Sequence, residues 1–166
     1  MNVERLRSLM RRFSDIRIAV IGDFFLDLYF DVDPVLAEVS LETGRTAHQV
    51  RAIRPSPGAA GTVVSNLSSL GAGRIDGVGL IGDDGFGFEL RRTLESLNCS
   101  THLIFNDDEK VTPVYLKPRD IEKPGLKGEY DRYDLKNRVP TSARSEDLLL
   151  NAIRAVSYTH LTLPTN

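Results

Sequence analysis

The stretch RPSPGAAGTVVSNLSSLGAG (Arg54–Gly73) joins a loop of proline, glycine and alanine directly to a helix-like pattern. Gly71 stands where a helix C-cap is expected, after apolar residues at helical spacing: Val63, Val64, Leu67 and Leu70. Backbone N–H groups at the start of such a helix are free, and small residues let a ligand approach them closely. The stretch therefore predicts either a tight structural turn or a ligand-binding loop.

Short apolar segments lie on both sides of this stretch. IRIAVIGD (16–23) and IDGVGLIGDD (75–84) each combine the residues of a buried strand with a Gly-Asp turn. Helical patterns occur at FGFELRRTLESLN (86–98) and at SEDLLLNAIRAV (145–156), where Ser145 is the expected N-cap. Because strands alternate with helices, we predict an α/β fold with a parallel sheet and right-handed crossovers.

Other strand patterns do not fit a doubly wound sheet. LDLYFDV and VTPVYLK are more amphipathic, and residues 33–50 read as loop with a strand near AHQVRAI. Residues 118–143 combine charge, glycine and proline, which is typical of an exposed excursion. We therefore expect a small second sheet, or lid, with strands near 28–53 and 111–117.

The composition of the 166 residues excludes several classes of protein. A hydrophobic fraction of 41% supports a packed core, and a net charge of -2 argues against a nucleic-acid-binding protein. The single cysteine, Cys99, permits no intrachain disulfide, and the 3 histidines lack metal-ligand spacing. No apolar run approaches the roughly 20 residues that cross a bilayer.

The arginine-rich start, MNVERLRSLMRRFSD, reads as an amphipathic helix, because Glu4 and Asp15 argue against a transit peptide. We expect a cytoplasmic protein with no nucleic-acid or membrane partner and no metal site in this chain.

The usual phosphate-binding signatures do not fit the glycine-rich stretches. A Walker-type loop needs Gly-Lys before Ser or Thr, and a dinucleotide fingerprint needs G-x-G-x-x-G after the first strand, where this chain has GDFFLD (22–27). Local chemistry alone favours a structural turn at Gly58. Asp23 and Asp27 change this balance, because open α/β sheets bind ligands at the carboxyl ends of their strands. Asp23 suits a role in its turn, whereas Asp27 is the better candidate to accept hydrogen bonds from a polyhydroxyl compound.

Three segments in this order resemble the N-terminal half of PfkB (ribokinase-like) carbohydrate kinases: IAVIGDFFLDLYF (18–30), PGAAGTVVSNLSSLGA (57–72) and GVGLIGDDGFGFELRRTLESL (77–97). The likeness spans residues 16–139, and GDFFLDLYF together with DRYDLKN resembles the heptose-phosphate kinase branch. The resemblance implies a Rossmann-like α/β domain with helices on both faces, incomplete here, plus a small β lid. It also implies transfer of a phosphoryl group from ATP, with Mg²⁺, to a hydroxyl of a sugar or sugar phosphate.

The resemblance assigns substrate-binding roles to particular residues. Asp27 would bind sugar hydroxyls, and Gly58 and Ala59 stand where the family's Gly-Gly pair approaches the sugar. Thr62 replaces an asparagine that contacts the sugar, and its hydroxyl offers one donor where the amide offers two donors and an acceptor. Arg132 matches a basic residue near the lid.

The family's catalytic Gly-Ala-Gly-Asp segment, which supplies the anion hole and the base, does not occur in this sequence. We therefore expect residues 1–156 to be the N-terminal part of one kinase domain and to be inactive alone, with catalytic, ATP-binding and Mg²⁺-binding residues elsewhere in the parent.

The ending VSYTHLTLPTN (156–166) resembles translated read-through of a sequencing adapter, so we interpret residues 157–166 as an artefactual tail. The resemblance also implies a possible homodimer of the parent through its lid.

Two other functions stay open at this point. One is a non-catalytic sugar-binding or scaffold protein on the same fold, which Ala59 and Thr62 favour. The other is a nucleoside kinase of the same superfamily. The distal aspartate separates the enzyme from the binding protein, and competition between sugars and nucleosides separates the two kinases.

Overall fold

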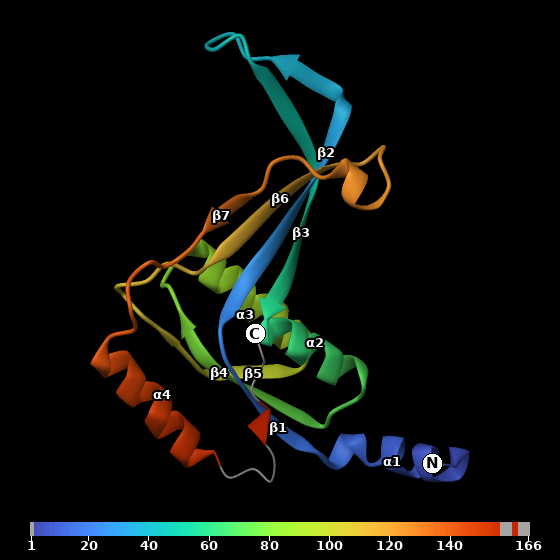
Figure 1. Ribbon diagram of the computed structural model, residues 1–166, viewed down its shortest axis with the longest axis vertical. Helices are drawn as coiled ribbons and strands as arrows, with labels where there is room; N and C mark the ends of the chain where they lie inside the picture. The colour runs from blue at the N-terminus through green and yellow to red at the C-terminus, as the bar shows by residue number, and fades with distance from the viewer. Residues whose placement is uncertain (1, 157–160, 163–166) are drawn as a thin grey trace.

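The computed structural model describes residues 2–156 and 161–162, and its framework is a 4-stranded parallel sheet (Figure 1). In spatial order the strands are β5 (Cys99–Asn106), β4 (Arg74–Ile81), β1 (Arg17–Ile21) and β8 (Leu161–Thr162). The prediction of a parallel sheet from alternating strands and helices is confirmed. Apart from β8, the segment interpreted as an artefactual tail lies outside the described residues.

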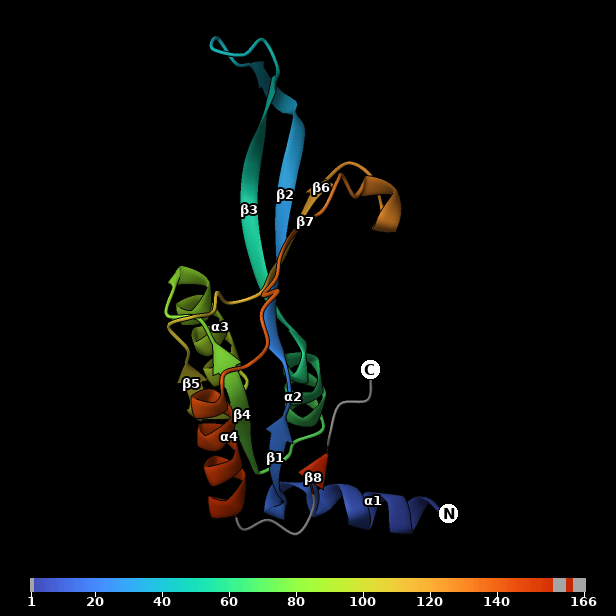
Figure 2. The same cartoon turned by 60° about the vertical axis from the view of Figure 1, so that its left-hand side comes forward.

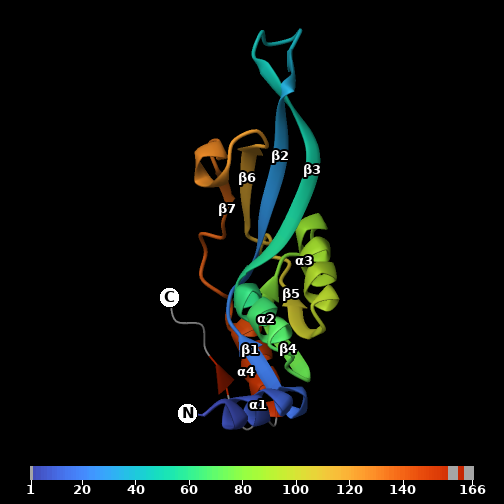
Figure 3. The ribbon, with the colours of Figure 1, turned by 90° about the vertical axis from the view of Figure 1, so that its right-hand side faces the viewer.

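Helices cover both faces of this sheet, as predicted. They are α1 (Val3–Arg11), α2 (Ala60–Ser69), α3 (Gly85–Ser96) and α4 (Ala143–Ala155), with short 3-10 turns at Phe13–Asp15 and Gly125–Gly128. Figures 2 and 3 show α2 and α3 on one face of the sheet and α4 on the other. The predicted first helix forms, but none of its residues is buried. No helix among the described residues is long and apolar enough to cross a membrane.

The core forms where α2 and α3 pack on the parallel sheet. Its fully buried apolar side chains include Val20, Phe24, Leu26, Val64, Ile75, Leu90 and Leu94. Except for Phe24, which lies between two predicted strands, these residues come from the strand and helix patterns that the sequence displays. Their burial removes apolar surface from water and fixes the strand ends that carry the site.

The helix ends show how local sequence sets the element bounds. Gly71 has φ of +80° and follows the end of α2, which confirms the predicted C-cap glycine. The prediction that Ser145 caps α4 is wrong: Ser142 is the N-cap, and its Oγ accepts a hydrogen bond from the Ser145 N–H at 3.3 Å. Ser145 instead donates its hydroxyl to Oδ2 of Asp107 at 2.8 Å, so the helix starts earlier and is tied to the loop after β5.

A second 4-stranded sheet rises from the parallel sheet along the longest axis of the molecule (Figure 1). Its strands, in spatial order, are β3 (Thr46–Ala59), β2 (Phe24–Val39), β6 (Val114–Asp120) and β7 (Tyr133–Leu135). β2 pairs antiparallel with β3 and parallel with β6, and β7 pairs antiparallel with β6.

The expectation of a loop over most of residues 33–50 is wrong. β2 continues to Val39 and β3 begins at Thr46, with Glu38 opposite Ala47 near the hairpin tip. Register shifts interrupt the pairing after Asp31 and after Asp33. In this part of the hairpin, residues on both faces of the strands are exposed. The sequence therefore lacks the alternation of apolar and polar residues by which a half-buried strand is recognised.

Candidate functional site

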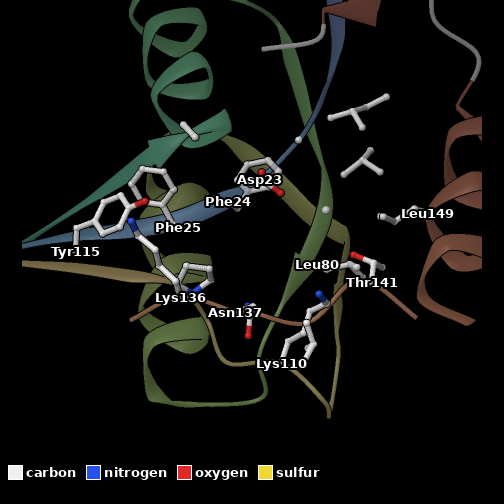
Figure 4. Close-up of a pocket in the computed structure, with 17 residues that line it drawn as sticks. Asp23, Phe24, Phe25, Leu80, Lys110, Tyr115, Lys136, Asn137, Thr141 and Leu149 are labelled. Carbon is white, nitrogen blue, oxygen red and sulfur yellow. The ribbon is translucent and has the colours of Figure 1, made fainter. Parts of the chain in front are cut away.

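A cavity of about 580 Å³ lies between the parallel sheet, the second sheet and α4 (Figure 4). Its floor is formed by residues at or after the carboxyl end of β1 and near the end of β4, and α4 contributes Leu149. Its polar lining residues are Asp23, Lys110, Tyr115, Lys136, Asn137 and Thr141. The cavity occupies the position in which open α/β sheets bind their ligands.

Two chain segments that carry lysines are tied together beside this cavity. The side-chain amide of Asn137 accepts a hydrogen bond from the N–H of Val111 at 3.0 Å and donates one to its carbonyl oxygen at 2.8 Å. Lys110 precedes Val111, and Lys136 precedes Asn137. The two hydrogen bonds therefore hold both lysines at the cavity rim.

The glycine-alanine loop meets the cavity through Ala59. This residue lines the cavity and precedes α2, with φ of 46° and ψ of -112°, a conformation that costs free energy for any residue with a Cβ. The N–H of Ala60 donates to the carbonyl oxygen of Asp23 at 3.1 Å, which joins the loop to the end of β1. At Gly58, an added Cβ would lie 1.9 Å from Cε2 of Phe25. Glycine is thus required where the Phe25 ring covers the loop.

Thr62 lies in the first turn of α2. Its hydroxyl donates a hydrogen bond to the carbonyl oxygen of Pro57 at 3.3 Å. The side chain thereby closes the loop that carries Gly58 and Ala59, and Thr62 does not line the cavity.

Asp27 lies on β2, on the same face of the second sheet as Phe25 and Tyr115, but does not itself line the cavity. It pairs in register with Ser56 of β3 and with Tyr115 of β6, which lines the cavity. Nζ of Lys117 lies 2.6 Å from Oδ1 of Asp27 and 5.1 Å from the ring centroid of Tyr29. Burial opposes the charged form of Lys117, but the hydrogen bond and the attraction to Asp27 outweigh it, so the pKa of Lys117 is raised.

Arg132 lies on the cavity side of the second sheet, next to β7. Its Nε is 2.7 Å from Oδ1 of Asp134, and its guanidinium carbon is 4.9 Å from the ring centroid of Tyr115. Lys136 approaches the same two groups, with Nζ 3.0 Å from Oδ2 of Asp134 and 4.9 Å from the Tyr115 centroid. The hydrogen bond to Asp134 raises the pKa of both cations. Two cations and one aromatic ring thus meet at the rim.

Of the predicted substrate-binding residues, the structure places only Ala59 in the lining of the cavity, and Thr62 contacts Pro57 instead. Gly58 adjoins the cavity through the Phe25 ring, and Asp27 and Arg132 adjoin it through Tyr115. The roles assigned to these residues in sugar binding stay predictions.

Sequence reasoning did not single out several polar residues of the site: Lys110, Tyr115, Lys117, Lys136 and Asn137. DRYDLKN, which carries part of the family resemblance, contains Lys136 and Asn137 and was the available signal for them. Lys110 lies in a short polar loop, and nothing in its local sequence marks it.

No family model matches the chain. It is 29% identical over 146 residues to the bifunctional protein HldE of Shewanella amazonensis, a match that covers 86% of this chain and 28% of that protein. It is 36% identical over 98 residues to the bifunctional protein HldE of Mesorhizobium japonicum, covering 59% of this chain and 19% of that protein. The chain therefore spans less than a third of the length of these curated relatives.

Solved structures share the fold at lower identity. The ATP-bound fructokinase of Xylella fastidiosa matches with 17% identity and a TM-score of 0.50, over 72% of this chain and 33% of that one. A Clostridium perfringens protein classed with the sugar kinases matches with 13% identity and a TM-score of 0.56, over 82% of this chain and 40% of that one. The sequence relatives and the shared fold support the resemblance of the chain, carried by the three segments in this order, to the PfkB (ribokinase-like) carbohydrate kinases.

Proposed function

We propose that the protein of which this chain forms part transfers a phosphoryl group from ATP to a hydroxyl of a sugar or sugar phosphate, and that this chain binds the acceptor. The observation that carries the proposal is the cavity at the strand ends, which combines hydrogen-bonding groups with ammonium groups. Its volume of about 580 Å³ lies within the range of small-molecule sites.

Neutral hydroxyls find suitable partners in this cavity. The Asp23 carboxylate accepts hydrogen bonds, the Thr141 hydroxyl donates and accepts, and the backbone at Ala59 is open to close approach. We assign sugar binding to Asp27, Gly58, Ala59, Thr62 and Arg132; Ala59 lines the cavity, and the Thr62 hydroxyl fixes the loop that carries Gly58 and Ala59.

The cationic rim favours a phosphorylated sugar over a neutral one. Lys110 and Lys136 both line the cavity, and the described residues give Lys110 no acidic partner. An ammonium group that faces a cavity without a carboxylate partner is suited to a phosphate oxygen. We therefore place the phosphate of the acceptor near Lys110.

ATP and Mg²⁺ are the cofactors that we propose for the parent. The described residues contain no cluster of three or more His, Cys, Asp or Glu side chains that could hold a metal ion. The sequence also lacks a Gly-Lys-Ser/Thr loop and the Gly-Ala-Gly-Asp segment. Because these residues do not fit either cofactor, we assign them only the binding and orientation of the acceptor sugar. The 166-residue chain by itself is expected to transfer no phosphoryl group.

The experiment extends the chain with the natural continuation of its reading frame, recovered by long-read sequencing of the source DNA across the Val156 codon. The purified parent is then assayed for ADP release from ATP with a panel of pentoses, hexoses, heptoses and their phosphates. We expect sugar-dependent ADP release that is strongest with a phosphorylated sugar. Absence of release across the whole panel would overturn the proposal.

A non-catalytic sugar-binding protein is the second candidate. Thr62 favours it, because the hydroxyl that replaces the family's asparagine is donated to Pro57 within the loop. The extended sequence separates the candidates: an aspartate in a distal Gly-Ala-Gly-Asp segment supports the kinase, and its absence supports the binding protein.

We also propose that the second sheet acts as a lid and joins two copies of the parent. Its face away from Asp27 carries exposed apolar side chains, with Ile53 58% and Tyr133 67% exposed. A cavity of about 760 Å³ on this face is lined by Phe30, Val32, Leu116 and Tyr133, among others. An exposed apolar surface of this kind is typical of a protein–protein contact.

A further inference from the structure

The ion pair between Lys117 and Asp27 differs from the other ion pairs in the described part of the chain. Both of its side chains are 18% exposed. In each of the other pairs formed by Lys or Arg the cation is at least 30% exposed. Water and salt weaken exposed ion pairs, and a shielded pair keeps more of its attraction. This pair therefore constrains its members more than an ordinary surface pair does.

The ammonium group of Lys117 is held on two sides by residues of β2. Lys117 lies on β6 directly opposite Tyr29, so it reaches diagonally along the sheet to Asp27. Its Nζ is 2.6 Å from Oδ1 of Asp27 and 5.1 Å from the Tyr29 ring centroid. Tyr29 is also covered by the guanidinium of Arg54, which is itself fixed to Asp31 by two hydrogen bonds of 2.8 and 2.9 Å.

Asp27, the other member of the ion pair, has few alternative partners. Oδ1 of Asp27 is buried and forms no further hydrogen bond among the described residues, so the ammonium group of Lys117 provides its compensation. Arg132 also attracts Asp27, but its guanidinium is engaged by Asp134 at 2.7 Å. A buried carboxylate oxygen without a cation would be costly, so the position of Lys117 dictates how the Asp27 carboxylate is turned.

We propose that Lys117 is a positioning residue for sugar binding: it holds Oδ1 of Asp27 and thereby fixes the side-chain rotamer that presents Oδ2 to the hydroxyls of the acceptor. The role of Oδ2 rests on the proposed function, whereas the control of the rotamer by Lys117 does not. A pre-oriented carboxylate binds more tightly because its rotational freedom is lost before the ligand arrives.

The first measurement needs no ligand. NMR three-bond couplings report the χ1 rotamer of Asp27 in the 166-residue chain and in the variants Lys117→Met, Lys117→Arg and Lys123→Met. Lys123 is the matched control, because it forms an ion pair with Asp120 at 3.1 Å and does not line the cavity. We expect one Asp27 rotamer in the unaltered 166-residue chain, in Lys117→Arg and in Lys123→Met. In Lys117→Met we expect averaging between rotamers. A single unchanged rotamer in a folded Lys117→Met chain overturns the inference.

The second measurement is binding of D-fructose and D-fructose 6-phosphate, followed by NMR titration. We expect Lys117→Met to weaken binding about tenfold, as for loss of one interaction with a charged group, and Lys117→Arg to restore most of it. In a chain that already carries Asp27→Asn, Lys117→Met should cause no further loss of sugar affinity, because the two residues act as one unit. If Asp27→Asn weakens binding and Lys117→Met does not, Lys117 has no positioning role.

The proposed function fails separately from this inference. If the unaltered chain binds neither sugar, or if Asp27→Asn leaves the affinity unchanged, sugar binding by Asp27 is wrong. The χ1 measurement still decides whether Lys117 sets the conformation of Asp27.

Discussion

Asn137 and Val111 form a reciprocal pair of hydrogen bonds that joins the segment after β7 to the loop before β6. The Asn137 amide accepts from the Val111 N–H at 3.0 Å and donates to its carbonyl oxygen at 2.8 Å. This contact imitates one rung of a β-ladder with a side chain in place of a backbone. It is the connection that places Lys110 and Lys136 at the same cavity.

Replacing Asn137 with alanine removes both hydrogen bonds. We expect a loss of about 1 kcal/mol in the free energy of unfolding, together with weaker binding of phosphorylated sugars, because the segments that carry the lysines separate. Urea denaturation and NMR titration measure the two effects. Asn151→Ala is the control, since Asn151 lies in α4 and accepts only an exposed bond of 3.4 Å from Arg154. Equal losses in both variants would show that the Asn137 contact has no special role.

Ala59→Gly should stabilise the protein. The positive φ of 46° at Ala59 strains a residue with a Cβ, and glycine removes that strain at some cost in the entropy of the unfolded chain. We expect a net gain of up to about 1 kcal/mol in thermal or urea unfolding. The same substitution at Ala52, an exposed residue of β3, should destabilise by a similar amount because glycine weakens a strand. A destabilising Ala59→Gly would contradict the assignment of strain.

Gly58→Ala should be destabilising through one identifiable clash. The new Cβ would lie 1.9 Å from Cε2 of Phe25, and this ring packs against Tyr115 with the centroids 4.6 Å apart and the ring planes tilted by 60°. We expect a loss of about 1–3 kcal/mol, as for overpacking of a well-packed site.

A double-mutant cycle identifies the cause. In a Phe25→Ala background the clash is absent, so Gly58→Ala should then lower the free energy of unfolding much less than it does in the otherwise unaltered chain. An unchanged cost in that background would mean that the backbone conformation at Gly58, and not the Phe25 ring, demands glycine.

The sequence predicted the parallel sheet and its helices because β1 and β4 are short apolar runs, and α2 and α3 carry apolar stripes with clear ends. It could not predict the outer half of the second sheet. Pairs such as Glu38 and Ala47 depend on hairpin register, and no buried face marks them. Ala59 was identified from the glycine-alanine loop. Lys110 was missed because its place at the cavity depends on a contact between segments 26 residues apart.

Asp84 should make stability depend on acid pH. Burial opposes its charged form, but hydrogen bonds from the backbone N–H groups of Thr112 and Gly87, both at 2.8 Å, outweigh burial and lower its pKa. A lowered folded-state pKa means that this stabilisation is present above the ordinary value of 3.8 and is lost as the pH falls through the folded-state pKa.

This pH dependence is tested by denaturing the unaltered chain and the Asp84→Asn variant between pH 6 and pH 2, roughly the range in which carboxyl groups titrate. The variant should be less stable than the unaltered chain at pH 6, and this difference in stability should shrink as the pH falls. Asp108→Asn, at an exposed position in the loop after β5, should show no such trend. A difference for Asp84→Asn that stays constant with pH would rule out the ionised carboxylate as the source.

Ile53→Asp should prevent pairing of the parent through its lid. Ile53 is 58% exposed on the apolar face of the second sheet, so a carboxylate is tolerated by the monomer but would be buried without a partner in a dimer. We expect the parent to sediment as a dimer and the variant as a monomer, with its melting temperature little changed at high dilution.

Arg54→Asp does not test this face, because Arg54 is paired with Asp31 on the opposite side of the sheet. Glu38→Gln, near the hairpin tip, is a milder control that should leave the dimer intact. A parent that sediments as a monomer at every concentration would exclude pairing through the lid.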